Sequence, residues 1–191
     1  MKALITGGAG FIGYHLSCEL VNRGYEVHIL DNFSRGVEDS YLINLSKNEK
    51  VKLISCDLLD ESCFSELSDD YEYIFHLAAI IGVQNVLNHS YDVLRKNVEL
   101  LIRIIDFAKF NSKLKRLVFA STSEIYAGTL KYYGMEIPTP EDTPLAITPL
   151  DSPRTSYMLS KIYGEALLYQ SDIPFTIIRP HNFYGPRMGM R

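Results

Sequence analysis

Tyr157 and Lys161 are the two side chains whose types and spacing most directly suggest catalysis. They stand four residues apart in a segment with helical spacing, so they share one face of the predicted helix. A lysine ammonium beside a tyrosine favours the phenolate and lowers the phenol pKa from about 10, which would make Tyr157 a base near neutral pH. The alternative is an exposed Tyr and Lys on an amphipathic helix, and the spacing taken alone favours that alternative.

Ser121, Thr122, Ser123 and Glu124 form a second reactive group, directly after a predicted strand over residues 116–120. Ligands bind at the carboxyl ends of the strands in an open parallel sheet, so these hydroxyls and this carboxylate are candidates for contact with a substrate. For Glu124 the alternative is a carboxylate that simply faces solvent at the end of the strand.

The glycine-rich stretch from Thr6 to Gly13 favours the catalytic interpretation of both groups. It follows an apolar run over residues 3–5 and opens a segment with helical spacing. Gly7 permits a tight turn, Gly10 lets backbone N–H groups approach a pyrophosphate, and Gly13 lets helix and strand pack closely. The helix N-terminus adds unpaired N–H donors and the positive end of a dipole. The stretch therefore predicts a dinucleotide-binding turn.

Asp31 closes a second predicted strand over residues 25–30, about 20 residues beyond the glycine turn. An acidic residue there accepts hydrogen bonds from the adenosine ribose and repels a 2′-phosphate, so NAD is favoured over NADP. Arg35 lies nearby and would favour NADP, although an arginine in a polar surface loop is common. Asn32 and Ser34 belong to the same loop, which we expect to line the adenosine edge.

Two more strand ends carry candidate cofactor contacts. Asp57 follows a predicted strand over residues 51–56. It either caps the next helix or contacts the adenine amino group, and the sequence favours neither role over the other. Ala78 and Ala79 follow the next strand, and small residues there let the backbone approach a cofactor. His76, near the end of that strand, is expected to be a hydrogen-bonded structural histidine rather than a catalyst.

Asn97 and the segment from Gly128 to Arg154 are features whose roles the sequence leaves open. Asn97 lies near the apolar face of a helix predicted over residues 91–111, where it is either a satisfied core amide or an anchor. The segment carries prolines at 138, 140, 144, 149 and 153 and is expected to be irregular. It is either a flap over the active site or a surface excursion.

Length, charge and cysteine content narrow the functional class. The 191 residues suffice for one domain with a sizeable core, and a net charge of −4 without a basic block argues against nucleic acid or an electrostatic membrane anchor. No apolar run reaches transmembrane length, and the N-terminus runs straight into a predicted strand, so we expect no leader. Cys18, Cys56 and Cys63 lack metal-ligand spacing, so we expect three reduced core thiols, no metal and a cytoplasmic location.

Six predicted strands, the last over residues 175–178, alternate with helical segments. This alternation predicts an α/β fold, a doubly wound parallel sheet of the Rossmann type with the strand order 3-2-1-4-5-6. Residues 1–191 are expected to form a single NAD-binding domain.

Taken together, the motifs resemble the extended short-chain dehydrogenase/reductases, the family of NAD-dependent nucleotide-sugar epimerases and dehydratases. The matching stretches span nearly the whole chain: the glycine turn, Asp31, Asp57, residues 76–79, Asn97, and residues 121–126, 157–161 and 179–187. The motifs and the resemblance give as candidate cofactor contacts Gly7, Gly10, Phe11, Ile12, Gly13, Asp31, Asn32, Ser34, Asp57, Leu58, Leu77, Ala78, Ala79, Asn97, Tyr157, Lys161 and Pro180.

The resemblance also implies roles in a reaction on a nucleotide-sugar. Tyr157 would remove the proton of a sugar hydroxyl, Lys161 would tune the tyrosine and hold the nicotinamide ribose, and Thr122 would align the hydroxyl. Oxidation by tightly held NAD would give a keto-sugar intermediate. Ser123 and Asn182 are the candidate substrate contacts, Asn182 at the place where the family binds the nucleotide-sugar phosphates.

The type of reaction is less closely defined. Residues 121–124 resemble UDP-glucuronate decarboxylases and also some 4,6-dehydratases. In dTDP-glucose 4,6-dehydratases an aspartate acts as the acid at the place of Ser123, so the serine here disfavours that mechanism. Glu124 is available as a base or acid for chemistry at a neighbouring carbon. Ala127 stands where the family usually has glycine, and Gly128 follows one residue later, a change expected to reshape the flap.

The resemblance implies a smaller C-terminal substrate domain, and we expect it to be nearly absent here, because residues 187–191 end where it should begin. We therefore expect a fragment, a shortened form or a chain that has lost its lid, one that binds NAD yet grips a nucleotide-sugar poorly. The alternatives are a UDP-glucuronate decarboxylase-like enzyme, a non-catalytic NAD-binding protein on the same fold, and an NADP-dependent reductase, which Asp31 opposes. The family often dimerises through the helices that carry Asn97 and Tyr157, and an outward-facing Leu168 would suit a homodimer.

Overall fold

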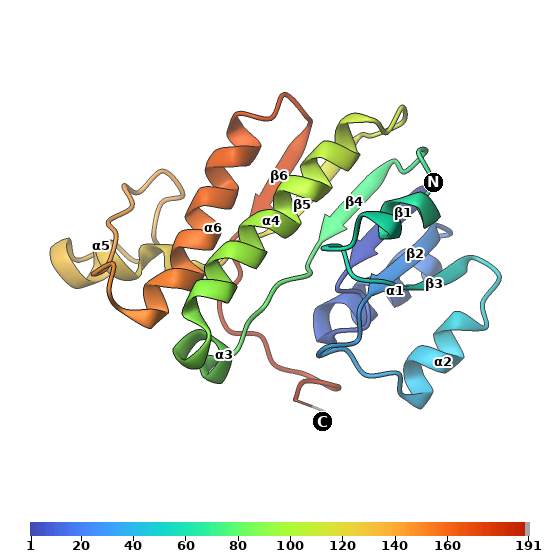
Figure 1. Ribbon diagram of the computed structural model, residues 1–191, viewed down its shortest axis with the longest axis horizontal. Helices are drawn as coiled ribbons and strands as arrows, with labels where there is room; N and C mark the ends of the chain where they lie inside the picture. Colours follow the sequence, from blue (N-terminus) through green and yellow to red (C-terminus); the bar gives the residue numbers. More distant parts are fainter. Residues whose placement is uncertain (190–191) are drawn as a thin grey trace.

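The computed structural model describes residues 1–189, and its centre is one six-stranded sheet (Figure 1). Every strand pair is parallel and the strand order is β3-β2-β1-β4-β5-β6, which confirms the predicted topology. The strands are β1 Lys2–Thr6, β2 Glu26–Asp31, β3 Val51–Ser55, β4 Tyr73–His76, β5 Arg116–Ala120 and β6 Phe175–Ile178. Met190 and Arg191, part of the single domain expected from the sequence, lie outside the described residues.

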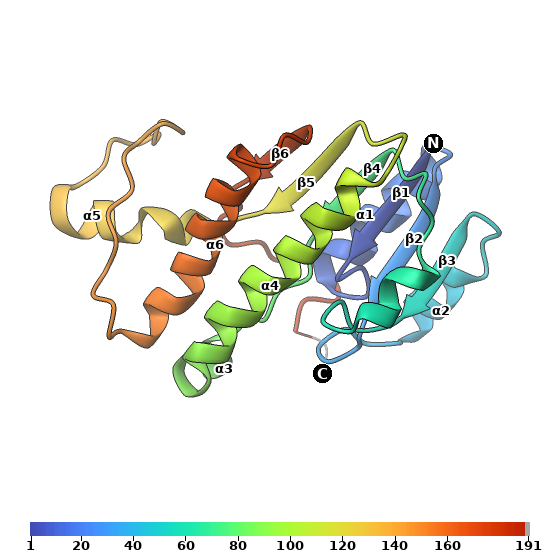
Figure 2. The same cartoon turned by 45° about the horizontal axis from the view of Figure 1, so that its top comes forward.

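Helices cover both faces of this sheet. They are α1 Phe11–Asn22, α2 Ser40–Ser46, α3 Val83–Asn88, α4 Ser90–Lys109, α5 Ala127–Tyr133 and α6 Pro153–Tyr169, with short 3₁₀ helices η1 Glu61–Glu66 and η2 Ser123–Tyr126. The long helices α4 and α6 lie side by side across one face (Figures 1 and 2). Leucines of α1 and α2 pack on the other face, so the central strands β1 and β2 are largely buried and mostly apolar, while the edge strands β3 and β6 are partly exposed.

The core on the α4 and α6 face corrects one expectation. Leu168 is fully buried there, against Leu101 and Ile104 of α4 and Leu117 of β5, and it does not face outward as predicted. Residues seven apart lie on the same face of a helix, and Leu168 stands seven after Lys161. Because the Lys161 side chain points into the protein, the Leu168 side chain points inward as well.

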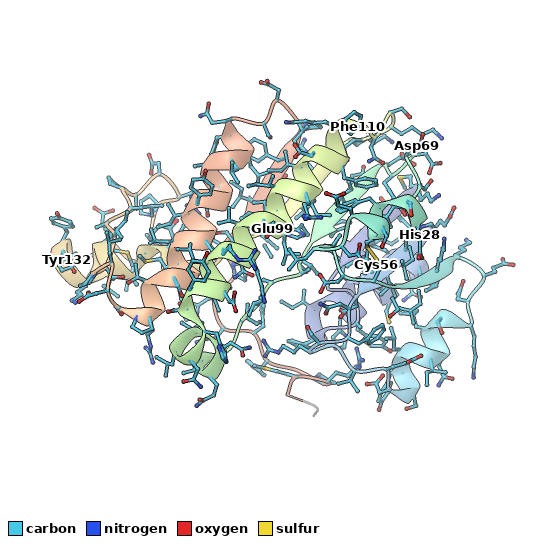
Figure 3. The ribbon with its side chains drawn as sticks, viewed as in Figure 1. His28, Cys56, Asp69, Glu99, Phe110 and Tyr132 are labelled. Carbon is cyan, nitrogen blue, oxygen red and sulfur yellow. A yellow bond between two sulfur atoms is a disulfide. The ribbon has the colours of Figure 1, made fainter. Side chains whose placement is uncertain are left out.

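The segment after η2 is more ordered than the sequence suggested. Its first residues form α5, which projects beyond the edge of the sheet with Tyr132 near its tip (Figures 1 and 3). Residues 134–152 are irregular as expected, and they fold back on α5. The Thr129 hydroxyl donates to the Pro144 carbonyl at 2.7 Å and accepts from the Ala146 N–H at 2.9 Å. A Cβ at Gly128 would meet the Ala146 carbonyl oxygen at 1.8 Å, so this contact requires glycine.

The cysteine prediction was wrong for two of the three residues. Cys56 and Cys63 form a disulfide, with Cα atoms 5.6 Å apart, while Cys18 is free (Figure 3). The reason is a tight turn after β3, which returns the chain on itself. Asp60 caps η1 by accepting from the Ser62 N–H at 3.0 Å, and the first turn of that helix brings Cys63 back to the end of β3.

His76 is a structural histidine, as predicted. It lies buried beneath the glycine turn, and its Nδ1 shares a hydrogen bond of 2.8 Å with the Thr6 hydroxyl. Burial, with a smaller contribution from the Lys161 charge, lowers the pKa of His76 to about 3. The folded protein therefore holds this imidazole neutral over the whole range in which the fold is expected to persist.

We predict that this histidine makes the protein less stable in mild acid. The unfolded chain binds a proton at His76 below about pH 6.5 and the folded chain does not, so His76 contributes a fall in the free energy of unfolding of about 1.4 kcal/mol per pH unit below that point, to which His28, whose pKa burial also lowers, adds. Urea unfolding at a series of pH values between 7.5 and 5 measures this slope.

His76→Gln should flatten the slope, because the uncharged amide binds no proton in either state. His89→Gln, at an exposed position, is the matched control and should leave the slope unchanged. Equal slopes in the protein and in His76→Gln would contradict the assignment.

Candidate active site

A cleft of about 870 Å³ opens at the carboxyl ends of the strands. Its walls come from the glycine turn, the loops after β2, β3, β4 and β5, the first turns of α6, and the segment that follows β6. All of the candidate site residues line this cleft except Asn97 and Ser123. The sequence did not single out several further lining residues, among them Val37, Ile80, Ile81, Lys96, Arg154 and Phe183.

The glycine turn forms the floor of the cleft. Gly7 has φ of 70°, and a Cβ there would meet the Ala78 backbone nitrogen at 2.7 Å. A Cβ at Gly13 would meet the Gly7 carbonyl oxygen at 2.5 Å. Gly10 is the N-cap of α1 and offers no side chain there. The turn and the end of β4 are thus in close contact, and the backbone at the N-terminus of α1 is open to a ligand.

Asp31 lines the cleft at the end of β2, and two backbone groups hold it there. Its carboxylate accepts from the Ala9 N–H at 3.0 Å and from the Phe33 N–H at 2.9 Å. Burial raises the pKa of Asp31, and these two hydrogen bonds oppose that rise. A carboxylate offers about four acceptor positions, so roughly two remain for a ribose.

Asp57 and Asn32 connect the loops after β3 and β2. Asp57 accepts from the Leu59 N–H at 2.9 Å and from the Asn32 side-chain amide at 3.0 Å. Its first bond shapes the turn after β3, while the capping of η1 falls to Asp60. Contact of Asp57 with adenine stays a prediction.

Asn97 is a satisfied amide that anchors the cleft wall. It accepts from the Ile80 N–H at 2.7 Å and donates to the Ile80 carbonyl at 3.0 Å. Both bonds join the Asn97 side chain to the backbone of Ile80. Asn97 therefore holds the cleft wall in place and does not itself line the cleft. Ser123 is likewise turned away, and its backbone N–H donates to the Pro180 carbonyl at 3.0 Å.

The candidate catalytic residues lie where the cleft borders β5 and α6, namely Tyr157, Lys161, Thr122 and Glu124. Asp57 and Asn32 lie at the other end of the cleft, after β3 and β2. Lys161 is buried, and its Nζ donates to the Ala120 carbonyl at 2.6 Å. The Thr122 hydroxyl accepts from the Glu124 N–H at 3.2 Å, which caps η2 and fixes Glu124 beside it. Burial lowers the pKa of Lys161 to about 8.

The expected depression of the Tyr157 pKa by Lys161 was wrong. Burial and, next, the negative charge of Glu124 raise the pKa of Tyr157 to about 12, and the Thr122 hydroxyl lowers it only in part. The Lys161 ammonium is directed at the Ala120 carbonyl and lies 5.7 Å from the centre of the Tyr157 ring. Sequence spacing gave the shared helix face correctly but could not give the direction of the ammonium.

A clasp at the other end of the cleft joins the segment after β6 to the loop after β2. Arg187 donates from Nε to Asp39 at 2.8 Å, and its guanidinium lies 4.0 Å from the centre of the Tyr14 ring. Asp39 also caps α2 by accepting from the Leu42 N–H at 2.9 Å. Both partners of this ion pair are largely buried, so the clasp closes that side of the cleft.

The comparisons with known proteins agree with this geometry. The family model described as the NAD dependent epimerase/dehydratase family matches residues 3–191. The chain belongs to this family. NAD is the cofactor of the family, and the resemblance inferred from the motifs is confirmed.

Relatives in the NAD-dependent epimerase/dehydratase family carry out different reactions. The chain is 37% identical over 190 residues to a UDP-N-acetyl-alpha-D-glucosaminuronate decarboxylase of Bacillus cytotoxicus, an alignment that covers 97% of this chain and 56% of that protein. It is 33% identical to a putative UDP-glucose 4-epimerase of Methanocaldococcus jannaschii, covering 96% and 56%. The chain thus spans little more than half the length of these relatives.

Solved structures of the family match the whole fold. A UDP-galactose 4-epimerase structure superposes with a TM-score of 0.80 at 29% identity, covering 100% of this chain and 59% of that one. The enzyme WbmG of Bordetella bronchiseptica, solved in complex with NAD, gives a TM-score of 0.79 at 28% identity, covering 100% of this chain and 56% of that one.

Among residues 1–189, no helix is long and apolar enough to cross a membrane, and no group of metal-binding side chains is present.

We predict that Tyr157 stays protonated at neutral pH when the cleft holds no ligand. A pKa of about 12 favours the phenol, so ultraviolet difference titration of the protein against Tyr157→Phe should show no phenolate absorbance between pH 6 and 9. Tyr163→Phe, an exposed position on the same helix, serves as the control for the subtraction. A difference signal that titrates near neutrality would contradict this prediction.

Proposed function

We propose that this chain is the cofactor-binding part of an enzyme that oxidises a hydroxyl group of a nucleotide-sugar with NAD. The observation that carries the proposal is the gathering of Tyr157, Lys161, Thr122 and Glu124 at one end of a cleft whose floor is the glycine turn. Relatives at 37% and 33% identity act on UDP-linked sugars according to their names, which supports this substrate class. The chain spans little more than half the length of these relatives. That residues 1–191 catalyse the reaction by themselves is therefore also part of the proposal.

The cleft suits a dinucleotide. Gly7 and Gly10 line it with backbone alone, and the N-terminus of α1 opens onto it. Asp31 keeps acceptor positions for ribose hydroxyls and its charge would repel a 2′-phosphate, which favours NAD over NADP. When bound, NAD would supply the acceptor for the hydride that leaves the sugar carbon.

In the proposed reaction the Tyr157 phenol first loses its own proton to solvent in the cleft, because a resting pKa of about 12 means that it starts protonated. The positive charges of the buried Lys161 ammonium and of bound NAD would favour that loss. Tyr157 Oη then takes the proton of the sugar hydroxyl, which Thr122 Oγ1 holds in line, as the carbon is oxidised to a ketone. Return of the proton from Tyr157 then accompanies reduction of the keto-sugar.

Glu124 is the residue that separates the possible outcomes. It lines the cleft two residues after Thr122 and lies close enough to Tyr157 for its charge to raise the tyrosine pKa. A carboxylate there can move a proton at the carbon next to the ketone, which dehydration or decarboxylation needs and 4-epimerisation does not. The likeness to a uronate decarboxylase supports decarboxylation as the second candidate outcome.

The decisive experiment follows NADH absorbance at 340 nm after the NAD-loaded protein is mixed with UDP-glucose, UDP-glucuronic acid or UDP-N-acetylglucosaminuronic acid. We expect NADH with at least one of them, and a loss of at least about 100-fold in rate for Tyr157→Phe with NAD still bound. Tyr163→Phe is the matched control. NADH formation at the same rate in Tyr157→Phe would contradict the assigned base.

We also propose a homodimer through the outer faces of α4 and α6. Aromatic side chains stand exposed there, with Tyr91 at 74% on α4, Phe110 at 81% directly after α4, and Tyr163 at 53% and Tyr169 at 67% on α6. An exposed apolar surface spread over two adjacent helices is typical of an interface.

Sedimentation velocity at micromolar concentration should give a dimer, and Tyr163→Glu should give a monomer, because a charge would be buried without a partner. Tyr132→Glu, on α5 away from these helices, should leave the dimer intact. A monomeric parent protein would contradict the proposal.

A further inference from the structure

Helix α6 contacts the end of β5 at three consecutive residues. Tyr157, Lys161 and Glu165 stand four apart and share the inward face of the helix. Lys161 binds the Ala120 carbonyl, Glu165 accepts from the Ser121 hydroxyl at 2.5 Å, and Tyr157 interacts with the Thr122 side chain. A shift of α6 along its axis would break all three contacts at once, so together they fix the register between the helix and the strand end.

Glu165 is the most firmly held member of this set. Its side chain is buried, and Oε1 accepts from both Ser121 and Arg179 Nε, the latter at 3.1 Å. Oε2 accepts from Arg179 Nη2 at 2.7 Å, which completes a two-point pair with the guanidinium. A buried pair of this kind adds little net stability over apolar packing, but it does demand one geometry.

Arg179 extends the same network beyond the helix. Its Nη1 donates to the Tyr126 hydroxyl at 2.5 Å and to the Glu141 carbonyl at 2.6 Å. Tyr126 ends η2, the 3₁₀ turn that contains Glu124, and Glu141 belongs to the irregular segment 134–152. One guanidinium at the end of β6 therefore joins the helix of Tyr157, the turn of Glu124 and the segment that flanks them.

We propose that Glu165 and Arg179 are positioning residues, which set Tyr157 against Thr122 and Glu124 and fix the 134–152 segment relative to that site. The proposal rests on the function proposed above, and neither residue touches a reacting atom. Glu165 does not line the cleft and Arg179 does not either, while Thr122, Glu124 and Tyr157 all do. The pair thus acts through the residues that it holds.

The first test is hydrogen–deuterium exchange of the NAD-loaded protein, which requires no substrate. Glu165→Gln removes the charge that Arg179 grips, and Arg179→Lys leaves one nitrogen where the network uses three. Both variants should exchange faster in peptides covering residues 120–126 and 134–146, and at the parental rate in residues 2–13. The controls are Glu99→Gln, on the outer face of α4 (Figure 3), and Arg116→Lys, at the opposite end of β5, and they should change neither region.

The second test separates positioning from mere stability. With the UDP-sugar that yields NADH in the parent protein, Glu165→Gln and Arg179→Lys should lower the single-turnover rate of NADH formation by roughly 10- to 100-fold while Kd for NAD changes by less than about threefold. The double variant should match the more impaired single variant, because both changes break one unit.

Two results would overturn the positioning role. One is local exchange and hydride rate both unchanged in Glu165→Gln and Arg179→Lys. The other is faster exchange throughout the chain together with loss of NAD, which would make the pair a general stabiliser. If the parent protein forms no NADH with any of the three UDP-sugars, the proposed function fails, and the exchange experiment alone still decides whether the pair fixes these segments.

Discussion

The bond from the Lys161 ammonium to the Ala120 carbonyl is the interaction on which the arrangement of the site depends. A buried lysine is costly unless its charge meets acceptors, and here it meets that carbonyl and the face of Phe119, 4.8 Å from the ring centre. The same bond ties α6 to the end of β5. Tyr157, one helical turn earlier, is thereby carried to Thr122, so the group that would serve the chemistry also holds the scaffold together.

The position of the cleft follows from the topology of the sheet. With the order β3-β2-β1-β4-β5-β6, the chain leaves β1 toward one side and returns through β4 on the other. A crevice forms where the loops after these two strands diverge. The glycine turn lies there, and Gly7 contacts the backbone at Ala78 more closely than any residue with a side chain at position 7 could.

The sequence was sufficient for the features that depend on local pattern. Strand order, the glycine turn and the shared face of Tyr157 and Lys161 follow from apolar periodicity and fixed spacing, and the structure has all three. The direction of the Lys161 ammonium, and with it the raised pKa of Tyr157, depends on which carbonyl is nearest in three dimensions.

Two other features could not be predicted from the sequence, for the same reason. The disulfide of Cys56 and Cys63 needs the turn geometry after β3. Glu165 shows only a helical spacing of eight from Tyr157, a signal too weak to interpret before its partner Arg179, directly after β6, is known. The roles of individual residues in binding NAD or a sugar remain predictions that rest on motif and geometry.

The clasp between Arg187 and Asp39 bears on whether a cofactor can be exchanged during the reaction. Asp39 follows β2 and Arg187 follows β6, so one largely buried ion pair joins two distant parts of the chain at the edge of the cleft. A dinucleotide that left the cleft past this side would require the pair to part. A reaction that takes two electrons from a sugar and returns them to the same sugar needs no release of the cofactor, so a closed clasp would not slow it.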